Sequence, residues 1–167
     1  SNLQTIAQRF VNNNVDLCCG ISTPAAQTLA NATKTIPIVG NAITSFETAK
    51  LVKSDKHPGG NVTGVSDMAP VAAQLDLGLK LLPGTKKVGS MYTSSEMNCH
   101  VQINIAKEHL KKLGIAYEEG SVNTVNDIQE IARGLISRGV NFIYVPTDNI
   151  IVSATPALVA ITDEAKI

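Results

Sequence analysis

This chain of 167 residues has no surplus of charge, because 14 basic residues balance 14 acidic ones. A balanced chain without a long basic run gives no indication of nucleic acid or an anionic membrane surface as a partner. No apolar run approaches the roughly 20 residues that a membrane-spanning helix needs. Aromatic residues are scarce and tryptophan is absent. The apolar content is nevertheless ordinary for a globular protein, so a sizeable core can form.

Cysteine is also scarce, and its positions argue against a metal site. The three cysteines are Cys18, Cys19 and Cys99. A zinc site needs closer and more numerous ligands, and the three histidines add no metal-like spacing. We therefore expect no metal and no cofactor. We expect buried free thiols that pack as small hydrophobic side chains, with Cys18 and Cys19 on opposite faces of one strand.

The most informative segment that is present reads ISTPAAQ, at residues 21–27. It follows an apolar run typical of a buried strand and opens a stretch of small residues typical of a helix. Pro24 suits the first helical turn, and Ser22 and Thr23 are favoured capping residues. Free N–H groups, the positive end of the helix dipole and hydroxyl donors converge there, which favours an anion. The pattern predicts a small polar ligand at the carboxyl edge of a sheet.

Hydrophobic periodicity predicts alternating strands and helices along the whole chain. Strands are expected at 15–22, 36–40, 62–66, 86–92, 115–122 and 140–145. Helices are expected at 2–13, 24–32, 70–82, 95–113 and 125–137, with one broken or started near Pro156 and a short helix or turn at 44–52. Thr124 and Asp127 resemble a capping box. This alternation predicts an α/β fold of doubly wound parallel sheets, with helices on both faces.

The segment 66–70 interrupts this rhythm, and we interpret it as a crossing between two lobes. Residues 1–67 are then part of an N-terminal lobe, and residues 68–167 are part of a C-terminal lobe. An ordinary βα loop within one sheet explains the periodicity equally well. The chain starts without Met in a predicted helix and stops where another strand is due, so we expect a fold that is incomplete at both ends.

Four segments occur in a characteristic order and spacing: STPAAQ at 22–27, IPIV at 36–39, PGGNVTGVSD at 58–67 and YVPTDN at 144–149. Together they resemble the substrate-binding proteins of a bacterial ABC transporter family, the one that includes tryptophan- and tyrosine-type binding proteins. The resemblance implies a type I periplasmic-binding-protein fold with ligand in a cleft between lobes. It also implies an amino-acid ligand such as Trp, Tyr or Phe, a membrane permease as partner, and a periplasmic or lipid-anchored location.

An amino acid carries a carboxylate and an ammonium group, and polar residues that follow the predicted strands could hold both. In the first half, Ser22, Thr23 and the amides around Ala25 supply donors for the carboxylate. The further candidates are Asn41, Thr44 and Asp67 in the first half, and Tyr92, Ser94, Ser95, Asn98, Thr147, Asp148 and Asn149 in the second. Asp148 is favoured over Asp67 and Glu96 as the ammonium partner. Capping, turn formation and packing are the alternative roles of these residues.

Two other functions compete with transport. A doubly wound enzyme is the less favoured, because no Gly-rich phosphate motif or G-x-S-x-G elbow is present. A nucleophilic Cys99 near Glu96 and His100 is conceivable, but adjacency in sequence is poor evidence for such a site. The ligand-sensing core of a transcription regulator uses the same fold and would need a helix-turn-helix headpiece. Fold alone does not decide between these functions.

Overall fold

A computed structural model describes residues 2–167 and contains two compact units. Unit 1 is Ser1–Met68, and unit 2 is Ala69–Ile167. The strands form two separate parallel sheets of three strands, one in each unit. The α/β architecture with parallel sheets confirms the predicted fold class. No helix within residues 2–167 is long and apolar enough to cross a membrane.

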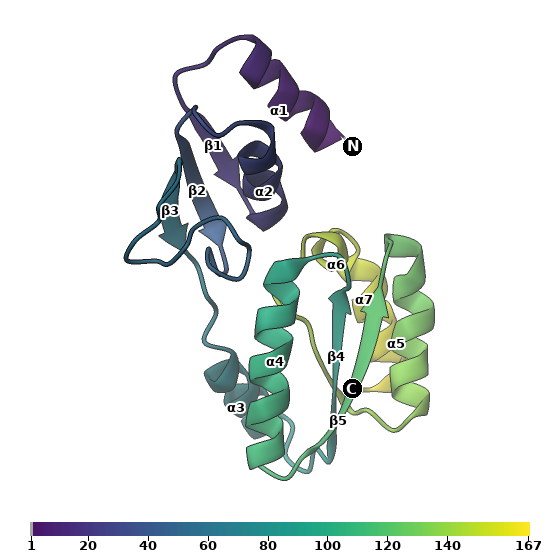
Figure 1. Cartoon of the computed structure of the whole chain (residues 1–167). Coiled ribbons are helices and arrows are strands. Elements are labelled where there is room, and N and C mark those ends of the chain that lie inside the picture. Colours follow the sequence, from purple (N-terminus) through teal and green to yellow (C-terminus); the bar gives the residue numbers. More distant parts are fainter. Residues whose placement is uncertain (1) are drawn as a thin grey trace. The chain divides into compact units, whose positions relative to one another are not determined.

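Unit 1 contains α1 (Asn2–Asn12), β1 (Cys18–Ile21), α2 (Thr23–Ala32), β2 (Ile38–Ile43) and β3 (Val62–Ser66), and its strand order is β1-β2-β3. Helix α2 packs against β1 and β2, and α1 packs against α2 (Figure 1). Cys18 is buried beneath α2, whereas Cys19 and Ile21 are exposed on the other face of β1. The alternation of the two cysteines is as predicted, but the expectation that both are buried is wrong for Cys19.

The expected helix or turn at 44–52 is a series of turns, and its apolar side chains Phe46, Ala49 and Leu51 belong to the buried core of unit 1. The core side chains of unit 1 form one cluster, to which α1, α2, the sheet and the turns at 44–52 all contribute. Val65 of β3 is 67% exposed and Ile21 of β1 is 66% exposed. Within the described residues of unit 1, no helix covers these two side chains. The prediction that helices cover both faces of each sheet therefore does not hold at these two positions.

Unit 2 contains α3 (Val71–Leu81), β4 (Lys87–Thr93), α4 (Met97–Lys112), β5 (Ala116–Val122), the 3₁₀ turn η1 (Val125–Asp127), α5 (Ile128–Ser137), β6 (Phe142–Tyr144), α6 (Asn149–Ser153) and α7 (Thr155–Ala165). The strand order is β5-β4-β6. One buried cluster joins α3 and α4 to the sheet, and a second joins α5, α6 and α7 to it. Helices therefore cover both faces, with α4 and α5 on opposite sides of the strands (Figure 1).

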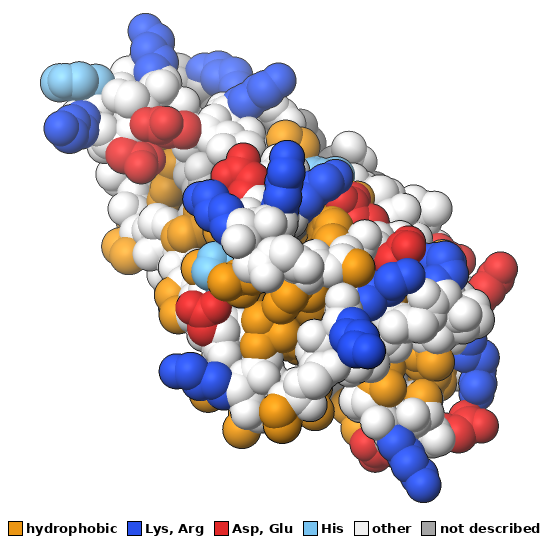
Figure 2. All heavy atoms as spheres, turned by 90° about the horizontal axis from the view of Figure 1, so that it is seen from below, with side chains coloured by type: hydrophobic (Ala, Val, Ile, Leu, Met, Phe, Trp, Pro, Cys, Tyr) orange, Lys and Arg blue, Asp and Glu red, His pale blue; other side chains and the backbone are white. Residues whose placement is uncertain are grey.

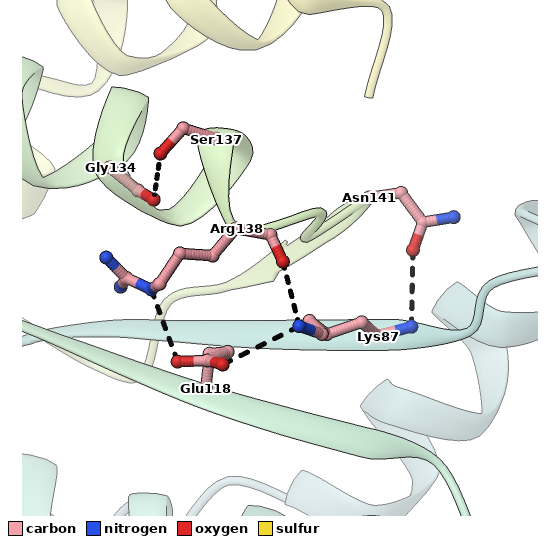
Figure 3. A network of polar contacts seen from close by, with 6 residues as sticks. All are labelled: Lys87, Glu118, Gly134, Ser137, Arg138 and Asn141. Carbon is pink, nitrogen blue, oxygen red and sulfur yellow. Dashed lines mark hydrogen bonds and ion pairs between the residues drawn. The ribbon is translucent and has the colours of Figure 1, made fainter.

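The amino-terminal end of this sheet is fastened by a network of polar side chains (Figure 3). Glu118 of β5 lies 3.6 Å from Lys87 Nζ and 3.3 Å from Arg138 Nε. Lys87 Nζ also donates to the carbonyl of Arg138, and the Lys87 amide donates to Asn141 Oδ1. These ion pairs are partly exposed, so each contributes at most about 1 kcal/mol. The opposite, carboxyl end of the sheet lies outside this network.

The predicted capping box is present at η1, where the Asp127 side chain accepts hydrogen bonds from the N–H groups of Asn123 and Thr124, at 2.9 and 3.0 Å. These bonds hold the pKa of the Asp127 carboxyl below its usual value. A lowered pKa in the folded state means that this contribution to stability is present above the unfolded-state pKa. It is lost as the pH falls through the folded-state pKa.

We therefore expect Asp127→Asn to lower the melting temperature at neutral pH and to reduce the difference from the wild-type protein in acid. The physical reason is that a protonated Asp127 no longer offers a charged acceptor to the two amides. Melting temperatures followed from neutral pH to below about pH 4 measure this, since that is where aspartates titrate. Two parallel curves, with a constant offset at every pH, would contradict it.

Candidate functional site

In unit 1, the turn from β1 into α2 holds its first residue in an unusual backbone conformation. Ser22 has φ 80° and ψ 153°, a region that is essentially reserved for glycine. It occupies the N-cap position of α2, but its side chain makes no capping hydrogen bond. Among the described residues, the N–H groups of Thr23 and Ala25 have no hydrogen-bond acceptor. The start of α2 therefore presents unpaired donors and one strained, uncommitted hydroxyl.

The neighbouring strand ends place the other predicted residues of unit 1 at the same sheet edge. The backbone carbonyl of Asn41 in β2 accepts from the Ser22 N–H at 3.0 Å, so these two residues are adjacent. The Asn41 side chain accepts from the amide of the next residue, as in a turn. Thr44 is buried, and Asp67 is exposed, with its amide bonded to the Ile43 carbonyl. Ser22 and Asn41 are thus brought together, whereas a ligand role for Thr44 and Asp67 stays a prediction.

In unit 2, the carboxyl ends of β4 and β6 meet at a buried carboxylate, Asp148. It is 4% exposed and is the N-cap residue of α6, where it accepts from the N–H groups of Ile150 and Ile151. It also accepts from the Thr93 N–H at 2.6 Å, from the Thr93 hydroxyl at 2.8 Å and from the Cys99 thiol at 3.2 Å. Asp148 therefore joins the end of β4, helix α4 and helix α6.

Next to it lies a second buried carboxylate, Glu96, which is 5% exposed and occupies the N-cap position of α4. It accepts from Asn98 Nδ2 at 2.9 Å, from Asn149 Nδ2 at 2.7 Å and from the Asn149 N–H at 3.2 Å. Asn98 Nδ2 also donates to the Thr147 carbonyl at 2.8 Å. Ser95, which was expected to cap the helix or face a ligand, is exposed just before Glu96. The predicted residues Asn98, Thr147 and Asn149 are thus gathered around one acid.

Tyr92 and Ser94 make contacts toward β5 and α4. The Tyr92 hydroxyl donates to Glu119 at 3.2 Å, and its ring meets the His100 ring edge-on at 5.5 Å. Burial, followed by the nearby Glu119 carboxylate, raises the pKa of Tyr92. The Ser94 hydroxyl donates to Asn123 Oδ1 at 2.7 Å. Neither Ser94 nor Ser95 caps the start of α4 with its side chain. The contacts of Tyr92 are those of a packed side chain, which is the alternative role considered for it. A role of Tyr92 in ligand binding stays a prediction.

The arrangement around Cys99 does not resemble a nucleophilic centre. The thiol is fully buried and donates a hydrogen bond to Asp148, and the Nε2 atom of His100 bonds to the Ser94 carbonyl instead. Burial, then the Asp148 and Glu96 carboxylates, raise the pKa of the Cys99 thiol. The side chains of Glu96, Cys99 and Asp148 have ligand-type atoms within 4.8 Å of one another. Because the Cys99 thiol donates a hydrogen bond to Asp148 at 3.2 Å, we interpret these atoms as a hydrogen-bonded network.

Sequence reasoning missed the residues that support this network. Thr93 gives two hydrogen bonds to Asp148, and Gln102 of α4 accepts from both the amide and the hydroxyl of Thr147 at 3.3 Å. Both side chains are fully buried. A polar residue in the buried stripe of a predicted helix, as Gln102 is, could have signalled a partner, since buried polar groups are almost always hydrogen-bonded.

The surface charge agrees with the balanced composition. On the face drawn in Figure 2, Lys and Arg side chains alternate with Asp and Glu side chains, and apolar side chains lie between them. The pairs Lys107–Glu119 and Arg133–Glu164 show the same mixing of signs in unit 2.

A sequence model of the family described as "ABC transporter substrate binding protein" matches residues 1–167. The chain is 40% identical over 164 residues to a curated tyrosine-binding protein of Clostridioides difficile (strain R20291), which covers 98% of this chain and 47% of that protein. It is 41% identical, with a TM-score of 0.93, to an ABC domain from Streptococcus pneumoniae solved in complex with L-Trp, over 98% of this chain and 55% of that one.

A conserved domain protein of Vibrio cholerae is similar to the same extent, at 37% identity and a TM-score of 0.93 over 98% of this chain and 55% of that one. The chain thus spans about half the length of the relatives it matches. A Lactococcus lactis transcription regulator shares only the fold, at 17% identity with a TM-score of 0.61 over 99% of this chain and 58% of that one. The whole-length family match decides what the fold alone could not: this chain belongs to the family of ABC transporter substrate-binding proteins.

Proposed function

We propose that this chain is part of the substrate-binding component of a bacterial ABC importer. We propose further that its ligand is an amino acid and that it prefers an aromatic side chain. A relative at 40% identity is named as a tyrosine-binding protein, and another at 41% was solved with L-Trp. The protein would bind and release its ligand without chemical change. Its place of action would be outside the cytoplasmic membrane, in the periplasm or at the outer surface on a lipid anchor.

The observation that carries this proposal is a complementary pair of polar groups at sheet edges. Unit 1 offers unpaired N–H donors at the start of α2, which suit a carboxylate. Unit 2 offers two buried carboxylates, Glu96 and Asp148, and no Lys, Arg or His within residues 2–167 forms an ion pair with either. Buried anions without a cationic partner favour an ammonium group. An amino acid carries both matching charges.

Mechanistically, we propose that the two units are parts of two lobes and that one ligand is held by both. A ligand that contacts both lobes stabilises a closed form by its differential contacts with that form. The closed form would then present a distinct surface to a membrane permease. The buried, hydrogen-bonded Cys99 gives no support to the alternative of an enzyme.

The direct test is calorimetric titration of the full-length protein with L-Trp, L-Tyr and L-Phe. We expect stoichiometric, saturable binding of at least one of them, together with a rise in melting temperature, because a ligand that binds only the native state stabilises it. Recovery of the ligand unchanged after incubation distinguishes binding from turnover. No binding of any of the 20 amino acids would contradict the proposal.

The strained Ser22 gives a sharper prediction. Ser22→Gly should raise the free energy of unfolding by about 1 kcal/mol, because glycine tolerates this backbone conformation. The same change should weaken amino-acid binding by roughly tenfold, because a hydroxyl donor to the carboxylate is lost. Chemical denaturation and calorimetry measure the two effects separately.

Ser22→Ala is the matched control, since it removes the hydroxyl and keeps the strain. We expect it to weaken binding as much as Ser22→Gly does but without the gain in stability. Unchanged affinity in both variants would show that the Ser22 hydroxyl does not contact the ligand.

A further inference from the structure

The two buried acids of unit 2 differ in how much hydrogen-bonding capacity they have left. A carboxylate has about four lone-pair sites. Asp148 receives hydrogen bonds from five donors: two from Thr93, one from Cys99 and two from the first turn of α6. Every site on Asp148 is therefore occupied by a group of unit 2, and a ligand could bind it only by displacing one of them.

Glu96 has capacity to spare. Its Oε2 atom accepts from the side-chain amides of Asn98 and Asn149, at 2.9 and 2.7 Å. Its Oε1 atom has a single donor, the Asn149 N–H at 3.2 Å, and the same N–H is shared with Oε2 at 3.3 Å. The Oε1 atom thus has one long, shared hydrogen bond. The residues beside Glu96, Ser95 and Asn149, are exposed, so the carboxylate lies just beneath the surface of the unit.

A second acceptor beside Glu96 also lacks a donor. Asn98 is 4% exposed, and its Oδ1 atom is buried and has no hydrogen-bond partner within the described part of the chain. Its Nδ2 atom is committed to Glu96 and to the Thr147 carbonyl, which fixes the orientation of the amide. A buried acceptor without a donor costs about 1–3 kcal/mol. Glu96 Oε1 and Asn98 Oδ1 are therefore two acceptor atoms on neighbouring side chains, and each could accept a further hydrogen bond from an N–H group.

We propose that Glu96, assisted by Asn98, receives the ammonium group of the ligand, and that Asp148 is a positioning residue. Through Thr93, Cys99 and α6, Asp148 fixes the strand end and the helix start between which Glu96 lies. This inference rests on the proposed function, since it needs a ligand with an ammonium group. It replaces the assignment of that role to Asp148, which the sequence alone favoured.

The test compares L-Trp with indole-3-propionate, which has the same ring and carboxylate but no ammonium group, by calorimetry on the full-length protein. In the wild-type protein we expect L-Trp to bind at least tenfold more tightly than indole-3-propionate. Glu96→Gln should remove most of this preference, because it weakens L-Trp binding and leaves indole-3-propionate binding nearly unchanged. Glu118→Gln is the matched control, since that carboxylate pairs with Lys87 and Arg138 at the other end of the sheet, and it should keep the full preference.

A Glu96→Gln variant that folds and keeps the preference for L-Trp would overturn the inference and leave the proposed function intact. A wild-type protein that binds no amino acid would overturn both. If the variant does not fold, a crystal structure of the wild-type complex with L-Trp gives the answer. An ammonium nitrogen of L-Trp within 3.2 Å of Glu96, a normal hydrogen-bond distance, supports the inference. An ammonium nitrogen that is hydrogen-bonded to Asp148 or to neither acid contradicts it.

Discussion

Asp148→Ala is expected to destabilise the protein by about 3 kcal/mol or more, because each buried donor left without an acceptor costs about 1–3 kcal/mol and a lost N-cap costs about 0.5–2 kcal/mol. The loss leaves the Thr93 amide, the Thr93 hydroxyl and the Cys99 thiol without their acceptor in a buried place. It also removes the N-cap of α6, whose first-turn amides then have no side-chain partner. No described basic residue pairs with Asp148, so no freed cation adds to or offsets this loss.

Equilibrium denaturation measures this effect, and Asp163→Ala provides the control. Asp163 lies on the exposed face of α7, and its side chain takes part in no hydrogen bond or ion pair within residues 2–167. We expect the control to change stability by less than about 0.5 kcal/mol, as exposed substitutions generally do. A loss from Asp148→Ala as small as that of the control would mean that the five hydrogen bonds contribute little to folding.

Gly64→Ala is expected to destabilise unit 1 by about 3 kcal/mol or more, because strained backbone and overpacking act together. Gly64 of β3 has φ 156° and lies opposite Gly40 of β2, next to an irregularity in the register of the two strands. A Cβ atom at Gly64 would lie 1.9 Å from the Gly40 carbonyl oxygen and 2.7 Å from its carbonyl carbon. Both are backbone atoms, so the clash can be relieved only by separating the strands.

The matched control is Gly60→Ala, four residues earlier, where an added Cβ meets nothing within 4 Å. We expect its stability to be unchanged or slightly higher, since alanine restricts the unfolded chain more than glycine does. Thermal or chemical denaturation of the two variants gives the comparison. Equal stability of both variants would show that β2 and β3 can move apart at Gly64 without cost.

Much of the fold could be predicted because its signals are local. Pro24 at a helix start and the alternation of Cys18 and Cys19 depend only on nearby residues, and both are found as expected. The capping box of Thr124 and Asp127 is also confirmed. The turns at 44–52 were harder to predict, because three apolar side chains in that segment are buried by tertiary packing and not by helical periodicity.

The candidate site was predicted less completely. Polar residues after the strands, such as Asn98 and Asn149, were identified because parallel strands end at a common edge. The sequence could not predict which of the two carboxylates has all its hydrogen-bonding sites occupied and which has one to spare. The donors of Asp148 include Thr93, which lies 55 positions away in the sequence. The strain at Ser22 could not be predicted either, because serine is an ordinary capping residue. Its positive φ and the lack of a capping hydrogen bond from its side chain are seen only in the folded structure.

The sequence by itself determined the alternating elements, the polar residues at the strand ends and the family to which the chain belongs. These follow from periodicity, capping preferences and the order of motifs, all of which are written in consecutive residues. Only the tertiary structure decided how the buried donors are shared between Glu96 and Asp148. That choice depends on contacts between β4, α4 and α6, which the chain brings together only when it folds.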